Sequence, residues 1–174
     1  MAVLPLCSIH DPELRRKAKK VPKIDGSIRR LVDDMIDTMR AASGVGLAAP
    51  QIGVSLRIAV IEVLGEDVVV LINPEVVKRG GERLLTEACL SVPGYYGQIT
   101  RSEWIKVKAL DKKGKGFHLK GEGLLAQALE HELDHLNGTL YIDHLTGPEK
   151  LQKVSPQIEP NSNQNVSPSH GSEG

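Results

Sequence analysis

The segment Leu124–Asn137, Leu-Leu-Ala-Gln-Ala-Leu-Glu-His-Glu-Leu-Asp-His-Leu-Asn, constrains this chain more than any other stretch. On a helix with 3.6 residues per turn, His131, Glu132 and His135 share one face with leucines. The remaining polar residues are expected on the opposite, outward face: Gln127, Glu130, Asp134 and Asn137. An inward polar group without a partner costs about 2–7 kcal/mol. The segment therefore predicts a buried helix whose inward polar side chains are compensated by something inside the fold.

The inward residues form the pattern His131-Glu-Leu-Asp-His135. Two imidazoles one helical turn apart can bind one divalent metal ion, and the Glu between them can accept a proton from a metal-bound water. The pentapeptide also occurs by chance, and a lone inward His is more often a hydrogen-bonded core residue. Two His and a Glu on one apolar stripe favour a metal site, which still needs a third ligand.

Cys89 is the leading candidate for that ligand because it is the only thiol outside the terminal region, where Cys7 lies. A single Cys is usually a small buried hydrophobe. A thiolate and two imidazoles would leave one tetrahedral position open, as in catalytic metal sites. Two cysteines make no disulfide framework, which favours a reducing, intracellular setting.

Composition narrows the class of protein. With 174 residues the chain is expected to form one domain, and its 22 basic and 22 acidic side chains cancel. No global field favours nucleic acid or a membrane, so no specific nucleic acid and no membrane partner is expected, while the zero net charge leaves a local charged patch open. No apolar run approaches 18 residues, and the N-terminus lacks the basic start and apolar stretch of a secretory signal.

Periodicity predicts the other elements. Residues from Ile28 to Met39 recur with the spacing of an amphipathic helix, which Ser27 would cap, and Asp11-Pro12 resembles another helix start. Asn73-Pro74 is expected to break a strand. The segments rich in β-branched residues or alternating in polarity predict short strands at 56–63, 68–72, 75–78, 103–110, 116–120 and 140–143. Their short connections predict antiparallel pairing.

Two further segments differ from these elements. Gly44–Gly53 is rich in small residues that allow close approach to the backbone, and Gln51 can both donate and accept hydrogen bonds there. Such a loop is more often a turn than a site. The chain is divided into a catalytic domain at 1–148 and a C-terminal tail at 149–174, which is rich in Ser, Pro, Asn and Gln and is expected to be disordered and dispensable.

Three segments together resemble the peptide deformylases. They are Gly44-Val-Gly-Leu-Ala-Ala-Pro-Gln51, Glu87-Ala-Cys-Leu-Ser91 and His131-Glu-Leu-Asp-His135-Leu-Asn-Gly138, and the resemblance covers roughly residues 4 to 146. It implies an α+β fold with antiparallel or mixed sheets around a central helix that bears the His pair. It also implies removal of the formyl group from N-formylmethionyl nascent chains, giving formate and a free N-terminal Met. Such substrates imply a bacterial cytoplasmic or organellar location, with the ribosome exit region as a further partner.

The resemblance also implies residue roles. Cys89, His131 and His135 match the metal ligands, with Fe²⁺ the usual ion and Zn²⁺, Ni²⁺ or Co²⁺ able to replace it. Glu132 matches the general base and acid, and Gln51 and the Leu90 N–H match donors to the carbonyl oxygen. The positions that match substrate-binding residues are Gly44, Val45, Gly46, Leu85, Tyr96, Leu124 and Ala128.

The sequence departs from the family pattern at a few positions. Ala88 replaces a usual Gly, Tyr96 falls where many members carry an Arg, and Glu130 stands where Gln is common. Because Glu130 is expected to face outward, it should matter little. Two alternatives stay open. One is a His-Glu-x-x-His endopeptidase that uses His144 as third ligand, and the other is a silent homologue that binds nascent chains or the ribosome without chemistry.

Overall fold

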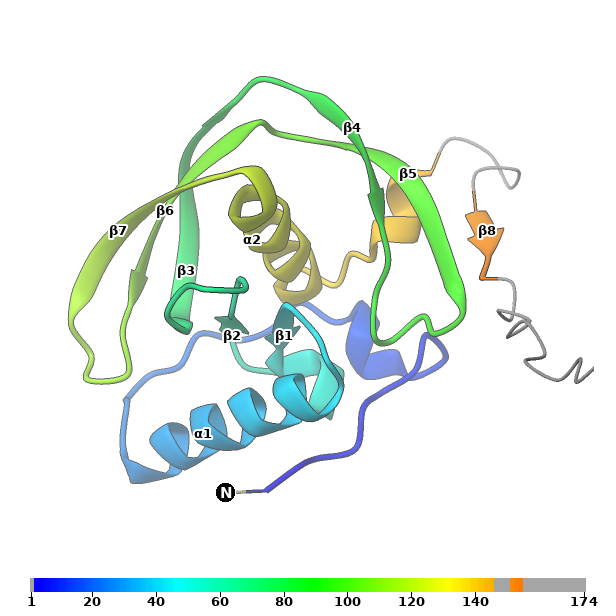
Figure 1. Ribbon diagram of the computed structural model, residues 1–174. Helices are drawn as coiled ribbons and strands as arrows, with labels where there is room; N and C mark the ends of the chain where they lie inside the picture. Colours follow the sequence, from blue (N-terminus) through cyan, green and yellow to red (C-terminus); the bar gives the residue numbers. More distant parts are fainter. Residues whose placement is uncertain (1, 146–150, 155–174) are drawn as a thin grey trace, which may run out of the picture.

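The computed structural model describes residues 2–145 and 151–154 (Figure 1). Two α-helices, eight strands and three short 3-10 helices are found in this part of the chain. In chain order the elements are η1 Pro12–Arg15, α1 Gly26–Ala41, β1 Gly46–Ala48, η2 Ala49–Ile52, β2 Ile58–Ile61, β3 Val69–Gly80, β4 Arg83–Glu87, β5 Tyr95–Arg101, β6 Trp104–Leu110, β7 Gly116–Glu122, α2 Gly123–Leu136, η3 Tyr141–His144 and β8 Leu151–Lys153. This confirms the predicted α+β class.

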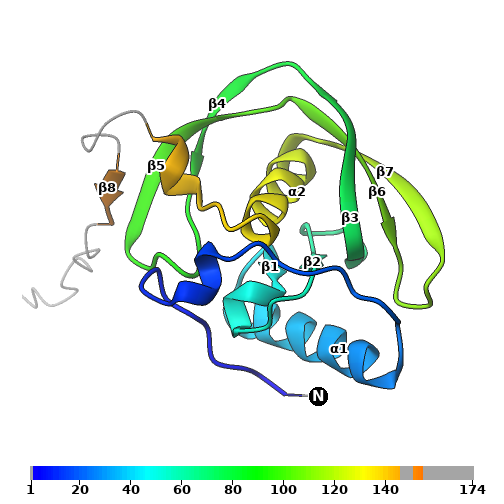
Figure 2. The ribbon, with the colours of Figure 1, turned by 180° about the vertical axis from the view of Figure 1, so that it is seen from behind.

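Two antiparallel sheets form the frame. The larger sheet has the order β1-β2-β3-β6-β7, and the smaller one has the order β4-β5-β8. The short connections of the sequence explain the pairing, because a link of a few residues can join only antiparallel neighbours. Seen from both sides, β4 and β5 continue the curve of β3 and β6 over the top of the molecule (Figures 1 and 2).

Helix α2 lies inside this curve, and α1 packs below it against β1 and β2 (Figure 1). Leu129, Leu133 and Leu136 of α2 pack against buried residues of β2, β3 and β6. Gly121 allows β7 to approach the helix closely, since a Cβ there would lie 2.7 Å from Leu129 Cδ1. The predicted central helix with its His pair is therefore found, packed against strands of the larger sheet.

The expected outward face of α2 is not all outward. Glu130 is buried, and its carboxylate accepts hydrogen bonds from the Ser102 N–H at 2.7 Å and from Arg79 at 3.1 Å. Asp134 is half-buried and pairs with Arg101. A helical wheel assumes one solvent side, whereas strands surround this helix on more than one side. The prediction that Glu130 faces outward is wrong for that reason.

Strand β3 differs from the prediction of two strands broken at Asn73-Pro74. It runs through both residues, and its register against β6 shifts between Ile72 and Glu75. Asn73 adopts the left-handed region with φ of 52°, and its side chain bonds the backbone N–H and C=O of Val21. Pro74 has no backbone N–H to donate to the neighbouring strand, and the bulge lies at this residue. Strand pairing therefore resumes beyond it.

Helix and strand ends correct further predictions. Asp25, rather than Ser27, caps α1, because its carboxylate accepts hydrogen bonds from the backbone N–H groups of Ser27 and Ile28. Leu140–Asp143 was expected to be a strand, yet Tyr141–His144 forms the 3-10 helix η3. The segment at Asp11 forms only the short η1. Local polarity patterns cannot separate one helical turn from a short strand.

The end of the chain is only partly described. Leu151–Lys153 lies in the range predicted to be disordered, yet it forms β8, which pairs with Tyr95–Gly97 of β5. Leu151 also packs against the buried cluster that contains Cys89 and Tyr141. Most of the predicted tail, including residues 155–174, lies outside the described residues. Among the helices that are described, none has the length and apolar character needed to cross a membrane.

Candidate metal centre

Three side chains from distant parts of the chain converge beside α2. Cys89 follows β4, and His131 and His135 lie one turn apart on α2. The Cys89 Sγ lies 3.2 Å from His135 Nε2, which in turn lies 3.2 Å from His131 Nε2. All three donor atoms lie within 4.8 Å of one another. One sulfur and two imidazole nitrogens thus face a common point, as the sequence predicted.

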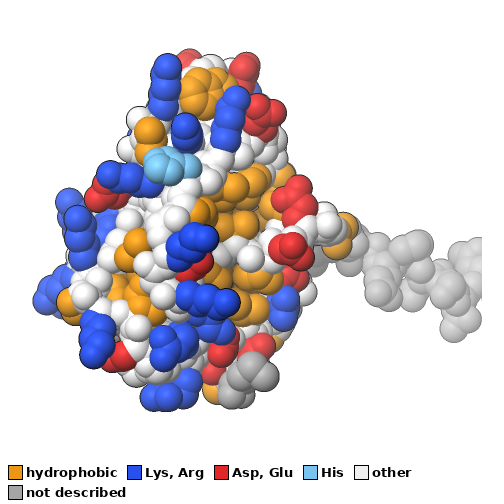
Figure 3. Space-filling model, turned by 90° about the vertical axis from the view of Figure 1, so that its left-hand side faces the viewer, with side chains coloured by type: hydrophobic (Ala, Val, Ile, Leu, Met, Phe, Trp, Pro, Cys, Tyr) orange, Lys and Arg blue, Asp and Glu red, His pale blue; other side chains and the backbone are white. Residues whose placement is uncertain are grey.

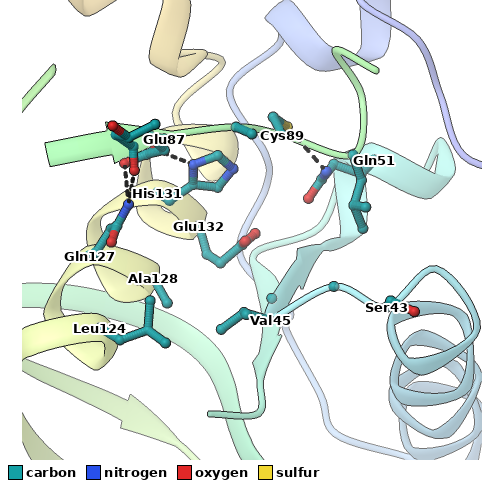
Figure 4. A pocket seen from close by; sticks show the side chains of 15 residues that line it. Ser43, Val45, Gln51, Glu87, Cys89, Leu124, Gln127, Ala128, His131 and Glu132 are labelled. Atoms are coloured by element: carbon teal, nitrogen blue, oxygen red, sulfur yellow. Dashed lines mark hydrogen bonds and ion pairs between the residues drawn. The ribbon is translucent and has the colours of Figure 1, made fainter. Parts of the chain in front are cut away.

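A buried ion network orients His131. Glu87, at the end of β4, contacts His131 Nδ1 and also pairs with Arg101 of β5 at 2.6 Å. Arg101 makes a second ion pair with Asp134 of α2 at 2.7 Å. Figure 4 shows the Glu87 contact on one side of the His131 ring. Because Glu87 holds Nδ1, the Nε2 atom of His131 is directed toward His135 Nε2. A carboxylate behind a metal-binding imidazole fixes its tautomer and its orientation.

This environment separates the protonation behaviour of the two histidines. Burial lowers the pKa of His135 well below its ordinary value, which keeps that ring neutral. Burial acts in the same direction on His131, but hydrogen bonds to Cys89 and Glu87 outweigh it and raise the pKa of His131. For Glu87, the contacts with His131 and Arg101 outweigh burial and lower its pKa to about 2. Glu87 therefore stays ionised and stabilises positive charge on the neighbouring His131.

Glu132 is 3% exposed and lies against β1. A Cβ on Gly46 would meet Glu132 Oε1 at 2.6 Å, so the glycine makes room for the carboxylate. Burial raises the pKa of Glu132 to about 7. Its Oε2 has no hydrogen-bond partner among the described residues. A carboxyl with this pKa and a free oxygen can accept and return a proton near neutral pH.

Gln51 reaches the same centre from η2. Its amide oxygen accepts a hydrogen bond from the Ala48 N–H at 2.9 Å, which fixes the side chain. Its amide nitrogen then lies 3.2 Å from Ser91 Oγ and 3.7 Å from Cys89 Sγ. From its sequence, the glycine-rich segment could be either a simple turn or part of a site. In the structure it places a buried hydrogen-bond donor beside Cys89 (Figure 4).

A cavity of about 370 Å³ opens in front of these residues. Apolar side chains line one part of it, and Glu132 projects into it from α2 (Figure 4). The residues that line it are Ser43, Gly44, Val45, Gly46, Gln51, Thr86, Glu87, Ala88, Cys89, Leu90, Leu124, Gln127, Ala128, His131 and Glu132. A cavity that joins an apolar part to converging polar groups is typical of a ligand site.

Two predicted substrate-binding residues lie outside this lining. Leu85 packs instead against the buried cluster that contains Cys89 and Tyr141. Tyr96 is half-buried in β5, where it pairs with Gln152 of β8. In β4 the two residues that follow Leu85, Thr86 and Glu87, line the cavity instead.

The donor set fits a divalent metal ion. A sulfur and two imidazole nitrogens are ligands that zinc and ferrous iron both accept, and the geometry leaves room for a further ligand on the cavity side. Cys89 is 8% exposed and His135 is 1% exposed, so these two candidate donors are shielded from bulk water. The orientation of His131 by Glu87 supplies the outer contact that such sites need.

Comparison with known proteins identifies the family. A family model for polypeptide deformylase matches residues 3–151. This chain belongs to the polypeptide deformylase family. A peptide deformylase of Dehalococcoides mccartyi is 54% identical over 160 residues, which are 91% of this chain and 96% of that protein. A peptide deformylase of Heliobacterium modesticaldum is 48% identical over 145 residues, which are 83% of this chain and 95% of that protein.

Solved deformylase structures have the same fold. The crystal structure of a peptide deformylase from Legionella pneumophila has a TM-score of 0.83 at 50% identity, covering 86% of this chain and 89% of that one. A peptide deformylase from Synechococcus elongatus, in complex with actinonin, has a TM-score of 0.82 at 39% identity, with 84% and 81% covered. The deformylase resemblance of the sequence is confirmed. The chain is a metal-dependent hydrolase that acts on N-formyl peptides.

Sequence reasoning assigned no role to Glu87 and Arg101. Glu87 stands two residues before Cys89 in a motif of the deformylase family, and that position was the available signal. No sequence pattern marks Arg101 as functional. Only the pairing of β4 with β5 brings it opposite Arg83 and into ion pairs with Glu87 and Asp134. Both side chains are buried to 4% exposure or less.

Proposed function

We propose that this deformylase removes formyl groups from N-formylmethionyl chains, with Cys89, His131 and His135 as metal ligands and Glu132 as general base and acid. The observation that carries the proposal is the arrangement of those three donors and one buried carboxyl around a single cavity. Family membership supports the reaction class.

The residues divide the chemistry among them. A divalent cation held by the three ligands would polarise the formyl carbonyl and lower the pKa of a nearby water. Glu132 takes a proton from that water as its oxygen attacks the formyl carbon. The same carboxyl then gives the proton to the amine as the C–N bond breaks, which yields formate and a free N-terminus.

The developing negative charge on the formyl oxygen requires donors. Gln51 and Leu90 both line the cavity, and we propose the side-chain amide of the first and the backbone N–H of the second for this role. One such donor is typically worth about 3–4 kcal/mol of activation free energy. Ala88, which precedes Cys89, also lines the cavity.

The apolar part of the cavity is proposed to hold the methionine side chain. Val45, just before β1, lines it together with Leu124 and Ala128 of α2. Gly44 and Gly46 flank Val45 in the cavity lining, and β1 is an edge strand, so its free backbone edge is proposed to pair with a substrate chain. We propose that Leu85 and Tyr96, which do not line the cavity, also contribute to substrate binding from positions behind or beside it.

The particular metal and the setting are also proposals. A mixed sulfur and imidazole site accepts Fe²⁺, which we propose as the native ion, and Zn²⁺, Ni²⁺ or Co²⁺ can occupy it. The bacterial relatives support a bacterial cytoplasmic setting, with nascent chains at the ribosome exit region as the substrates. An organellar setting is the alternative.

The deciding experiment is an anaerobic assay of formate release with iron-loaded or cobalt-loaded protein. Formyl-Met-Ala-Ser is the substrate, and acetyl-Met-Ala-Ser is the matched control. We expect release from the formyl peptide only. Casein cleavage without deformylation would identify an endopeptidase instead. Bound metal with no amide hydrolysis would identify a silent homologue.

A further inference from the structure

The outer face of the larger sheet carries three lysines in one cross-strand row. Lys78 of β3 lies opposite Lys106 of β6, which lies opposite Lys120 of β7. All three side chains are exposed. Neighbouring strands lie about 4.8 Å apart, so the row spans roughly 10 Å. Like charges placed directly opposite one another destabilise a sheet, so this row lowers the stability of the fold.

Acidic residues only partly neutralise this row. Lys120 pairs with Glu122 at 3.4 Å, where both side chains are more than half exposed. For Lys78 and Lys106 no ion pair is found among residues 2–145 and 151–154. The chain as a whole has no net charge, so a row of cations on one face is a local imbalance. Figure 3, which views this flank, shows many Lys and Arg side chains along it.

The basic face continues along the same strands. Lys108 lies opposite His118 and pairs with Glu75 at 3.2 Å, and Lys20 reaches that carboxylate at 3.4 Å. A hollow of about 330 Å³ lies at this end of the sheet and is lined by Asn73, Glu75, Lys108, Ala109, Leu110, Gly116, Phe117 and His118. It offers donors for an anionic group next to the lysine row.

The other end of the row holds one aromatic side chain. Trp104 is half-buried, and the Lys120 ammonium lies 5.2 Å from its ring centroid. A Cβ on Gly80 would lie 2.7 Å from Trp104 Cζ2, so the glycine lets the ring lie close on β3. Charged side chains and one aromatic ring therefore share a single sheet surface.

We propose that this face, the lysine row with Lys108, His118 and Trp104, is a docking surface for the phosphate backbone of unpaired RNA. Sheet surfaces that combine basic groups with aromatic rings are a recurring way to bind single strands, in which charge supplies affinity and stacking is tolerant of sequence. Backbone binding is independent of sequence, so it agrees with the expectation of no specific nucleic acid.

The chemistry of this face favours RNA over a membrane surface and over a protein partner. A membrane-binding face places apolar side chains where they can enter the lipid, whereas Trp104 lies against the sheet beside Gly80. A protein interface of ordinary size has an apolar core depleted of charge, whereas this row is made of exposed lysines. A regularly charged polymer matches a regular array of cations on adjacent strands.

The proposal is independent of the proposed catalytic residues. Ile105 and Val107 alternate with the outward lysines of β6 and are buried in the core that includes α2. The row therefore faces away from the helix that bears the histidines. Docking on RNA would hold the enzyme near chains that are still being synthesised, without any contact to the reacting atoms.

The test is fluorescence anisotropy of a labelled oligouridine of about 20 nucleotides with the full-length, metal-loaded protein at several salt concentrations. Binding to single strands weakens with salt at a log–log slope of about 0.7 per phosphate contact. The variant Lys78→Ala/Lys106→Ala/Lys120→Ala should reduce that slope by about 2 and raise Kd by at least about tenfold. Arginine at the same three positions should retain binding.

A matched control removes three cations elsewhere. The variant Lys17→Ala/Lys23→Ala/Arg30→Ala makes the same change in net charge at exposed positions and should bind RNA like the parent protein. Both triple variants should release formate from a short formyl peptide at the parent rate, which separates this inference from the catalytic one. Unchanged RNA binding after loss of the lysine row, equal loss in the control, or no salt-dependent binding at all would overturn the proposal. Tighter binding to phosphatidylglycerol vesicles or to polyglutamate than to RNA would also overturn it.

Discussion

At the scale of single residues, two neighbouring glutamates of α2 have opposite duties. Both carboxylate oxygens of Glu130 accept hydrogen bonds within the fold, one from the Ser102 N–H and the other from Arg79. Glu132 has an oxygen without a partner and projects into the cavity. The same side chain, two positions along one helix, is structural in the first case and available for chemistry in the second.

This contrast gives a paired prediction. Glu132→Ala should keep the metal and lose about 10²–10⁴-fold in turnover, because it removes the group that moves the proton. Formate release and metal content by elemental analysis are the two measurements. Glu130→Gln is the matched control, which should lower the unfolding temperature while the metal-loaded enzyme retains turnover. Substantial deformylation by the Glu132 variant would refute its role.

Cys89 is expected to be indispensable for tight metal binding. Cys89→Ala leaves two imidazoles, which cannot complete a three-ligand site. The metal content after dialysis should fall to a small fraction of that of the parent protein. Cys7→Ala is the control, since that thiol lies outside the cluster, and it should keep full occupancy. Full occupancy in the Cys89 variant would contradict the ligand assignment.

Glu87 should affect metal binding through His131 without touching the ion. Glu87→Gln removes the charge that Arg101 and His131 share, so metal affinity should fall about 10–100-fold. Loss of one partner of a buried ion pair also destabilises a fold by about 3–5 kcal/mol. Competition with a metal indicator measures the first effect, and urea unfolding of the metal-free protein measures the second. Equal metal affinity in the two proteins would remove Glu87 from the proposed role.

The same residue sets an expected pH dependence. The folded protein holds the pKa of Glu87 at about 2, below its ordinary 4.5. The unfolded chain therefore takes up the proton first as pH falls, and the stabilising effect of the carboxylate is lost between about 4.5 and 2. The metal-free parent protein should lose more unfolding free energy over this window than Glu87→Gln does. Parallel curves for the two proteins would argue against the paired carboxylate.

At the scale of elements, the fit of β1 against α2 decides where the Glu132 carboxyl, the proposed general base, lies. Glycine at position 46 is required because Glu132 occupies the space of a side chain there. Strand β1 is at the edge of the larger sheet, so its other side remains open along the cavity. One backbone position thus sets both the location of Glu132 and the access to it.

Gly46→Ala should therefore reduce turnover strongly and leave the metal in place. The new methyl group would lie 2.6 Å from Glu132 Oε1 and must displace it, and a shift of about 1 Å in a catalytic group can cost 10²-fold in rate. Steady-state kinetics and metal analysis test this together. Gly116→Ala is a control for the loss of a glycine, because a Cβ there would meet nothing within 4 Å and its φ lies outside the left-handed region. Normal turnover in Gly46→Ala would show that the carboxyl has room to move.

At the scale of the whole molecule, residues near the end of the chain pack against the region of Cys89. Strand β8 covers the edge of β5, and Leu151 packs against the cluster that contains Cys89. A chain ending at Val154 should keep its unfolding temperature. A chain ending at Leu145 should unfold about 2–4 °C lower, because it loses a partly buried leucine and the edge pairing. Differential scanning calorimetry measures both, and equal temperatures would show that β8 contributes nothing.

The convergence of Cys89, His131 and His135 could be predicted better than the frame around them. Metal ligands must carry particular atoms, and a helical turn fixes the spacing of two of the three. The course of β3 through Asn73-Pro74 could not be predicted, because the side chain of Asn73 is held by Val21, 52 residues away. The burial of Glu130 likewise depends on strands that wrap around α2, and no local pattern records them.

The ligand cluster also has a consequence for how this protein fails. Cys89 and His135 are separated by 46 positions in sequence. A cation shared between them therefore works as a reversible staple across a long loop, and its binding free energy adds to the unfolding free energy. Peroxide that converts the sulfur to an oxyacid would open that staple as well as stop turnover. Oxidised molecules should then be more easily degraded by proteases, so that oxidative damage would shorten the lifetime of the enzyme along with its activity.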